Sequence, residues 1–154
     1  MEQFFAQNGE MILRLMVAMG LGVLIGAERL LVHKEAGMKT HALVSMGAAV
    51  FILISEAVGE RYAGLPGFNP VMMAAQVVIG IGFIGAGAIM FQGSHLTGLT
   101  TAGGLWVTAG IGMAAGFGFF ALAVFATIFS LIVLTAMNFL EKPIKKISND
   151  IGQP

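Results

Sequence analysis

Residues 99–140 contain no Asp, Glu, Lys or Arg and are apolar along most of their length. A membrane-spanning helix needs about 20 mostly apolar residues, so this run of about 42 is long enough for two spans. Gly116-Phe117-Gly118 lies inside it and predicts the turn between them, because glycine is typical of positions where a helix ends. Such a run constrains the chain to a membrane, where helices satisfy their own backbone hydrogen bonds.

The composition of the whole chain supports a membrane location. Of 154 residues, 57% are hydrophobic and only 10% are charged, and the mean hydropathy is +0.90. A soluble domain of this length has too little interior to bury so much apolar surface. The formal net charge of zero provides no basic surface for nucleic acid, and the lack of Cys excludes disulfides and thiolate metal sites. The N-terminus lacks the basic region of a signal peptide.

The apolar runs predict five transmembrane helices and no strand. Lys142-Pro143 is expected to end the last helix, because proline lacks the N–H that a helix interior needs. We therefore predict a single transmembrane domain, residues 1–141, and a short cytoplasmic tail, residues 142–154. The fold class is an all-α, polytopic membrane helix bundle, with helices at about residues 11–32, 40–58, 71–91, 99–115 and 119–140.

Two loops of the chain follow the same plan. Gly26-Ala27 is followed, eleven residues after the glycine, by Gly37-Met38-Lys39-Thr40. Gly87-Ala88 is followed at the same distance by Gly98-Leu99-Thr100-Thr101. Each copy lies between two long apolar runs, so a helix–loop–helix hairpin is predicted to occur twice in parallel orientation. A repeat of this kind usually places its function at the interface between the copies.

Basic residues are concentrated in the first loop and in the tail, at Arg29, Lys34, Lys39, Lys142, Lys145 and Lys146. The connection 59–70 has only Arg61, and the N-terminal segment has only Arg14. Cytoplasmic loops carry the excess of Lys and Arg. We therefore expect the N-terminus outside, and the C-terminus and both repeated loops in the cytoplasm.

Polar residues of the two loops define a candidate site near the cytoplasmic surface, formed by Glu28, Arg29, Lys39, Thr40, Thr100 and Thr101. An ionisable residue bracketed by apolar residues in a span is a functional candidate. Glu28 and Arg29 can also simply pair with each other or extend to the lipid headgroups. For Arg29 we favour this structural interpretation, whereas for Glu28 the two interpretations have equal weight.

Thr40 and Thr101 are predicted to cap the helices that follow them, because a threonine hydroxyl accepts a hydrogen bond from a free N–H group. Two helix N-termini would then direct partial positive charge at the repeat interface, which favours an anion or the Glu28 carboxylate. A bare dication is disfavoured there. Mg²⁺ needs carboxylates and waters, and only Glu28 lies at this depth because Glu56 is near the opposite face.

Small residues and one amide are expected where helices touch. Gln76 lies inside a span, so its side chain is predicted to make an interhelical polar contact rather than to bind a ligand. Small residues four positions apart predict faces along which helices approach closely, or pair with another copy of the chain. The candidates for close packing are Gly22, Gly26, Gly82, Gly85, Gly112 and Gly116.

No catalytic, metal or cofactor site is predicted. Residues 80–85 have the spacing G-x-G-x-x-G, but neither a preceding strand nor a following acidic residue supports a dinucleotide site. No nucleophile can be combined with a base and an orienting acid, and no HExxH motif or P-loop occurs. His33, His41 and His95 lack metal-ligand spacing, and we expect them to be solvated. An enzyme is therefore not expected.

Three ordered motifs resemble the signatures of the MgtC/SapB membrane-domain family, and the resemblance covers roughly residues 10 to 138. The motifs are LIGAER (24–29) with AGMKTHALV (36–44), AQVV (75–78) with GIGFIGAG (80–87), and GLTTA (98–102) with LWV (105–107).

This resemblance implies a bacterial inner-membrane protein linked to survival in low magnesium and inside host phagocytes. The family's namesake is associated with restraining the membrane ATP synthase and carries a C-terminal cytoplasmic domain. Here the chain stops just after the fifth helix, and loop 92–97 lacks a basic residue that many members carry. These departures weaken the expectation of an ATP-synthase role but leave the membrane character unaffected.

Two functions of different classes remain open. The first is a regulatory membrane protein that acts by contact with another membrane complex. The second is a transporter or channel for Mg²⁺ or another ion, with its pathway at the repeat interface. The spans contain few polar side chains to line a path, which favours the regulator. The expected partners are the lipid bilayer and either another membrane protein or a second copy of the chain.

The predicted topology can be tested by labelling single cysteines, because the chain has no native Cys. With the N-terminus outside and five spans, a Cys introduced at Ser94 should be protected from an impermeant thiol reagent added to intact cells. It should react once the membrane is permeabilised. Labelling of that Cys from outside would contradict the assigned orientation.

Overall fold

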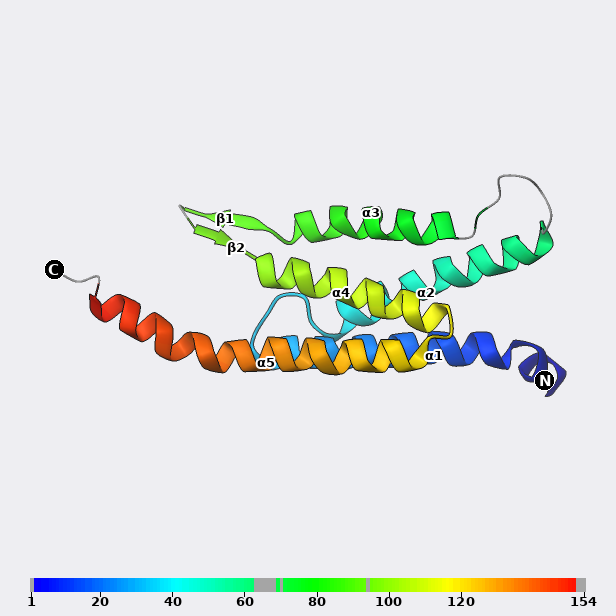
Figure 1. Ribbon diagram of the computed structural model, residues 1–154, viewed down its shortest axis with the longest axis horizontal. Coiled ribbons are helices and arrows are strands. Elements are labelled where there is room, and N and C mark those ends of the chain that lie inside the picture. Colours follow the sequence, from blue (N-terminus) through cyan, green and yellow to red (C-terminus); the bar gives the residue numbers. More distant parts are fainter. Residues whose placement is uncertain (1, 63–68, 70, 94, 152–154) are drawn as a thin grey trace.

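The computed structural model describes residues 2–62, 69, 71–93 and 95–151. The described residues form the predicted all-α membrane helix bundle together with one small β-hairpin (Figure 1). The elements are α1 (Glu2–Leu31), α2 (Met38–Arg61), α3 (Val71–Gly87), β1 (Met90–Gln92), β2 (His95–Thr97), α4 (Leu99–Gly116) and α5 (Phe120–Ile151). The stretches long and apolar enough to cross a membrane are Asn8–Leu31, Met38–Arg61 and Phe120–Met137, and α3 is a shorter apolar helix.

Helix α4 lies in the middle of the bundle and contacts α1, α2, α3 and α5 (Figure 1). Because these neighbours cover much of its surface, α4 does not need the composition of a lipid-facing helix. Its buried residues are accordingly mostly small or polar: Thr101, Gly104, Leu105, Thr108, Ala109, Ile111, Gly112, Ala114, Ala115 and Gly116. The outer faces of α3 and α5 instead carry large apolar side chains, such as Phe83, which is 84% exposed.

Glycines bring the backbones of α1, α2 and α4 into contact along what we call the three-helix seam. A Cβ atom at Gly112 of α4 would lie 2.0 Å from the Ser45 carbonyl oxygen of α2. One at Gly22 of α1 would lie 2.6 Å from the His41 carbonyl oxygen. Side chains cannot occupy such distances, so glycine at these positions is what allows the helices to approach this closely.

The four remaining glycines predicted at close contacts differ in what surrounds them. Cβ atoms at Gly26 and Gly116 would lie 2.5 Å and 2.9 Å from the Cα atoms of the facing helix, and one at Gly85 would make an ordinary contact with Ala102 at 3.7 Å. Gly82 was predicted wrongly for packing within the chain, because a Cβ atom there would meet nothing within 4 Å. The reason is that α3 buries only the face that carries Ile81 and Gly85.

Several predicted helix boundaries need correction. Helix α1 begins at Glu2 rather than near residue 11, because polar residues before the span also favour a helix. Helix α3 ends at Gly87 rather than at residue 91. Helix α5 continues through Lys142-Pro143 to Ile151, since a proline removes one hydrogen bond without always ending a helix. The predicted turn is confirmed: α4 ends at Gly116, and Gly118 has φ 76°.

A β-hairpin replaces the predicted end of the third helix and the loop after it. Met90 pairs with Thr97 and Gln92 with His95, and the connection between the strands begins at Gly93. Gly93 has φ 63°, the left-handed conformation that tight hairpin connections require. Ser94 itself lies outside the described residues.

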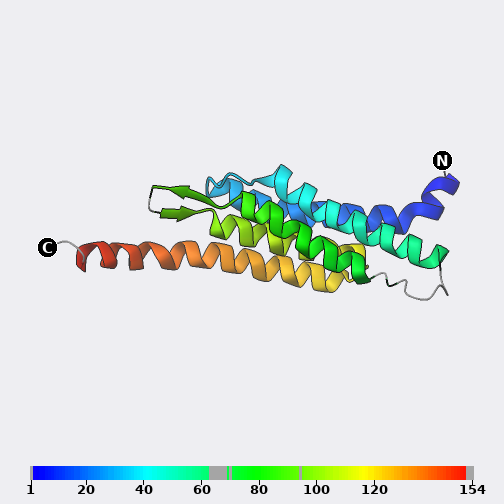
Figure 2. The same cartoon turned by 90° about the horizontal axis from the view of Figure 1, so that it is seen from above.

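The two repeated loops lie at one end of the bundle, which we call the loop end. It contains residues 32–37, the β-hairpin and the C-terminal part of α5 (Figures 1 and 2). The opposite end of the bundle, which we call the turn end, contains the start of α1 and the α4–α5 turn. Helices α2 and α4 begin at equivalent positions, immediately after Gly37 and Gly98. This arrangement is the one expected for a parallel duplicated hairpin.

The seam predicts opposite tolerances for two glycines on different helices. Gly112→Leu should lower the free energy of unfolding by about 3 kcal/mol or more, because backbone would have to move to admit the side chain. Gly82→Leu should change it by less than about 1 kcal/mol, because the position is open. Thermal unfolding in detergent, followed by circular dichroism, measures both. Equal losses for the two variants would contradict the packing described here.

Candidate functional site

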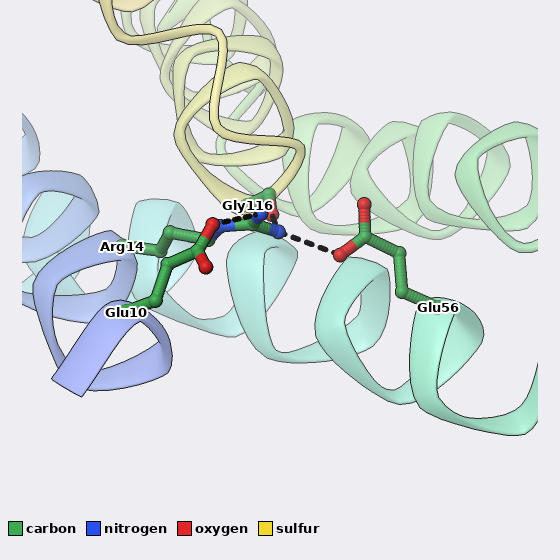
Figure 3. Close-up of polar contacts among 4 residues, drawn as sticks. All are labelled: Glu10, Arg14, Glu56 and Gly116. Atoms are coloured by element: carbon green, nitrogen blue, oxygen red, sulfur yellow. Dashed lines mark hydrogen bonds and ion pairs between the residues drawn. The ribbon is translucent and has the colours of Figure 1, made fainter. Parts of the chain in front are cut away.

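Arg14 joins three helices at the turn end (Figure 3). Its guanidinium donates hydrogen bonds to Glu56 of α2 (Nη1 to Oε2, 2.6 Å) and to the Gly116 carbonyl oxygen at the end of α4 (2.9 Å). A third bond reaches Glu10 one turn earlier on α1 (Nη2 to Oε1, 2.5 Å). A positive charge at this place stabilises the C-terminal carbonyl groups of α4. We call these four residues the turn-end cluster.

Arg14 was not among the predicted site residues, although its sequence context carries a signal. Arg14 is bracketed by the apolar residues Leu13 and Leu15 within a span, which is the same criterion that selected Glu28. Its side chain is only 16% exposed, so it is a partly buried charge that requires partners. Glu10 follows the helical i, i+4 spacing and was therefore also predictable as a partner.

Glu28 and Arg29 pair with each other at the loop end. Arg29 donates through Nε and through Nη2 (2.6 Å to Oε1) to the two carboxylate oxygens of Glu28. The Arg29 side chain is 1% exposed and that of Glu28 is 13% exposed. Of the structural alternatives, pairing is therefore the one observed, and Arg29 does not extend to the surface. We call these two residues the loop-end pair.

His41 was expected to be solvated, and this expectation is wrong. Its side chain is fully buried in the first turn of α2, within electrostatic reach of the loop-end pair. Nδ1 lies 3.1 Å from the Gly37 carbonyl oxygen, which can only accept, so Nδ1 carries a proton. Nε2 is buried, has no hydrogen-bond partner among the residues that the structure describes, and faces Gly104 of α4. The spacing His41, Ser45, Ala48 and Ile52 places His41 on the buried face of α2, a pattern visible in the sequence.

A second buried polar atom without a partner lies one turn further along α2. The Ser45 hydroxyl oxygen is enclosed in the three-helix seam, where Gly112 packs against the Ser45 backbone. Beyond it, Ala49, Ile111 and Ala115 are fully or almost fully buried. Apolar atoms therefore separate the polar atoms near the loop end from the turn-end cluster.

The predicted threonine caps are not formed. The N-cap residues of α2 and α4 are Gly37 and Gly98, and neither helix has a side-chain cap hydrogen bond. Thr40 and Thr101 lie three residues after these glycines, inside the first turn of each helix. The capping position itself is occupied by a glycine, which has no side chain that could accept a hydrogen bond. The first N–H groups of both helices are therefore left without side-chain partners.

Thr100 and Thr101 line a cavity of about 410 Å³ at the loop end. The cavity lies between the first loop, the β-hairpin and the first turn of α4, and it is lined by His33, Lys34, Glu35, Ala88, Met90, Gln92, Leu96, Thr97, Gly98, Leu99, Thr100 and Thr101. Glu28, Arg29 and Lys39 are not part of its lining, and Lys39 is exposed. The six predicted polar residues thus fall into separate places: Glu28 and Arg29 form the loop-end pair, Thr100 and Thr101 line the cavity, and the exposed Lys39 and the half-buried Thr40 lie in the first turn of α2.

Gln76 does not make the predicted contact within the chain. It is exposed on α3 and has no hydrogen-bond partner among the described residues. The reason is again that α3 presents only one face to the bundle. Within the same described part of the chain, no three His, Asp or Glu side chains gather in an arrangement that would hold a metal ion.

The loop-end pair predicts a specific cost for neutralising Glu28. Glu28→Gln should lower the free energy of unfolding by about 3 kcal/mol, because Arg29 would remain buried with its charge uncompensated. Glu60→Gln is the matched control, since Glu60 is exposed near the end of α2 and its change should cost less than about 0.5 kcal/mol. Denaturant or thermal unfolding of the purified variants measures both. Tolerance of both changes alike would show that the pair is not needed.

Similar proteins place these features in a family. The sequence profile of the MgtC family matches residues 15–143. The protein MgtC of Salmonella typhimurium is 47% identical over 137 residues, which cover 89% of this chain. A protein of Escherichia coli strain K12, YhiD, named as a proposed magnesium transporter, is 41% identical over 85% of this chain. An uncharacterised protein of Haemophilus influenzae is 42% identical over 77%.

These relatives are longer than the chain, which covers 55% of MgtC, 62% of YhiD and 52% of the Haemophilus protein. No solved structure matches the chain. The matched region contains the three-helix seam, the loop-end pair, His41 and the loop-end cavity, and it ends within α5. The chain is a membrane protein and belongs to the MgtC family.

Proposed function

We propose that the chain is a regulatory protein of the bacterial inner membrane that acts by contact with another membrane complex. Its role would be in adaptation to low magnesium and in survival inside host cells, as the family resemblance implies. In this proposal the loop end faces the cytoplasm and the N-terminus lies outside. Since the chain corresponds to only part of its longer relatives, the proposal concerns the membrane domain.

The observation that carries the proposal is the closed three-helix seam. Ion transport requires a polar, hydrated route past the contacts between α1, α2 and α4. Here Gly22 and Gly112 bring backbones together at Ser45, and the apolar residues beyond it are buried. In this conformation the interior is built to hold helices together rather than to admit an ion.

The outer face of α3 supports the second half of the proposal, contact with a partner. Gln76, Gly82 and Phe83 are all exposed on it. An amide that faces lipid lacks hydrogen-bond partners, and contact with another transmembrane helix can supply them. Gly82 would let that helix approach closely, because no other described element of the chain lies within 4 Å of its Cβ position. A second copy of the chain could meet this face in the same way as a different protein.

Transport of Mg²⁺ or another ion is the alternative. It is favoured by His41 Nε2 and Ser45 Oγ, two of the buried polar atoms that have no hydrogen-bond partner among the described residues. Both lie along α2 between the loop-end pair and the turn-end cluster. In another conformation they could contact water or an ion. The name given to YhiD also proposes magnesium transport for that protein.

Two measurements separate the proposals. For a regulator, liposomes that contain the purified chain should show no saturable flux of Mg²⁺ above that of empty liposomes. Gly82→Leu should leave the protein folded but reduce growth in low magnesium, because it blocks the outer face of α3 without touching the bundle. Gly47→Leu is the control, since Gly47 is also open but lies on α2. Saturable flux that is lost in Glu28→Gln would establish the transporter instead.

A further inference from the structure

We propose that the loop-end cavity binds a phosphate group, supplied either by free phosphate or by the headgroup of an anionic phospholipid. The cavity has a volume of about 410 Å³ and joins the two repeated loops. It differs from two other cavities of the bundle, which are lined almost entirely by apolar and small residues. The inference holds for either of the functions considered above, because it concerns a binding site outside the three-helix seam.

The first turn of α4 provides a site for an anion. Its first backbone hydrogen bond runs from the Ala102 N–H to the Gly98 carbonyl oxygen, so the N–H groups of residues 99–101 precede the helical ladder. No side chain caps them, because the N-cap residue is Gly98 with φ 87°. The helix continues for 18 residues, so its dipole adds partial positive charge at this end.

The Thr101 hydroxyl is an independent indication of a ligand. Thr101 is 8% exposed and lines the cavity, yet it makes no hydrogen bond within the described part of the chain. The other buried threonines, Thr108 and Thr127, donate to the carbonyl oxygen four residues earlier in their helices. Thr101 cannot do so because the residue four positions earlier, Thr97, belongs to β2. Its hydroxyl therefore remains available to an atom inside the cavity.

Side chains of the first loop complete the cavity. Lys34 and His33 line it from the end of α1. The His33 N–H donates there to the Leu30 carbonyl oxygen and the Lys34 N–H to the Arg29 carbonyl oxygen, and these two hydrogen bonds end the helix. Glu35 also lines the cavity and opposes an anion. One carboxylate is too few for Mg²⁺, which prefers several oxygen ligands. A lysine, a hydroxyl and free helix N–H groups together match the oxygens of a phosphate.

The test uses the full chain purified in dodecyl maltoside and inorganic phosphate as the probe, with binding measured by calorimetry. We expect saturable binding that exceeds any effect of sodium chloride at the same ionic strength. Thr101→Val and Lys34→Gln should each raise the dissociation constant about tenfold, the effect of losing one hydrogen bond to a charged group. Glu35→Gln should lower it, because a repulsive charge is removed.

Two matched controls use the repeat. Thr40 occupies the position in α2 that Thr101 has in α4, and Lys39 is an exposed lysine in the same region, but neither lines the cavity. Thr40→Val and Lys39→Gln should leave the dissociation constant unchanged. Circular dichroism of every variant checks that it is folded. Equal weakening by the controls and by the cavity variants would overturn the proposed site.

Competition identifies the source of the phosphate group. If a phospholipid is the ligand, short-chain phosphatidylglycerol should bind and displace inorganic phosphate, and Thr101→Val should weaken both. If free phosphate is the ligand, phosphatidylglycerol should leave the phosphate titration unchanged. Binding of neither probe, or binding that does not respond to Thr101→Val and Lys34→Gln, would refute the inference.

Discussion

Contact between helix backbones at glycine is the interaction on which the rest of this structure depends. Lipid tails are as apolar as leucine side chains, so helices in a bilayer associate through close packing and polar contacts rather than through hydrophobic burial. Gly22 and Gly112 bring α1 and α4 against the same turn of α2, around Ser45. The central position of α4 follows from this contact, because a helix surrounded by other helices can consist largely of small and hydroxyl-bearing residues.

Helix α1 carries one arginine toward each end of the seam, the partly buried Arg14 and the buried Arg29. Arg14 and Arg29 are separated by about 22 Å along the helix, at 1.5 Å per residue. Each is compensated by a carboxylate, and Arg14 also reaches the last carbonyl groups of α4. A buried ion pair adds little net stability over an apolar contact, but an unpaired charge is costly. These arginines therefore act mainly by excluding arrangements of α1 that would leave them without partners.

The sequence predicted the parts of this structure that depend on composition and local pattern. The fold class, the α4–α5 turn and the tight glycines of α1 and α4 follow from apolar runs and from the spacing of small residues. Contacts between distant segments could not be predicted in this way. Gln76 and Gly82 face away from the bundle because α3 buries only one side, which depends on how α3 docks against α4. His41 was misjudged because its nearness to a loop was given more weight than its place on the buried face of α2.

The two copies of the hairpin differ at the helix that precedes each loop, and this difference accounts for the loop-end cavity. In the first copy α1 continues past Gly26 to Leu31. A Cβ atom at Gly26 would lie 2.7 Å from the Met38 nitrogen, which shows that the start of α2 packs directly on α1. In the second copy α3 ends at Gly87 and the chain turns into the β-hairpin. Helix α3 therefore does not continue alongside its loop as α1 does, and the first loop borders the space that remains beside the first turn of α4. The same loop plan thus produces a helix N-terminus packed on α1 in one copy and one that opens into a polar cavity in the other, and the proposed phosphate site follows from this difference.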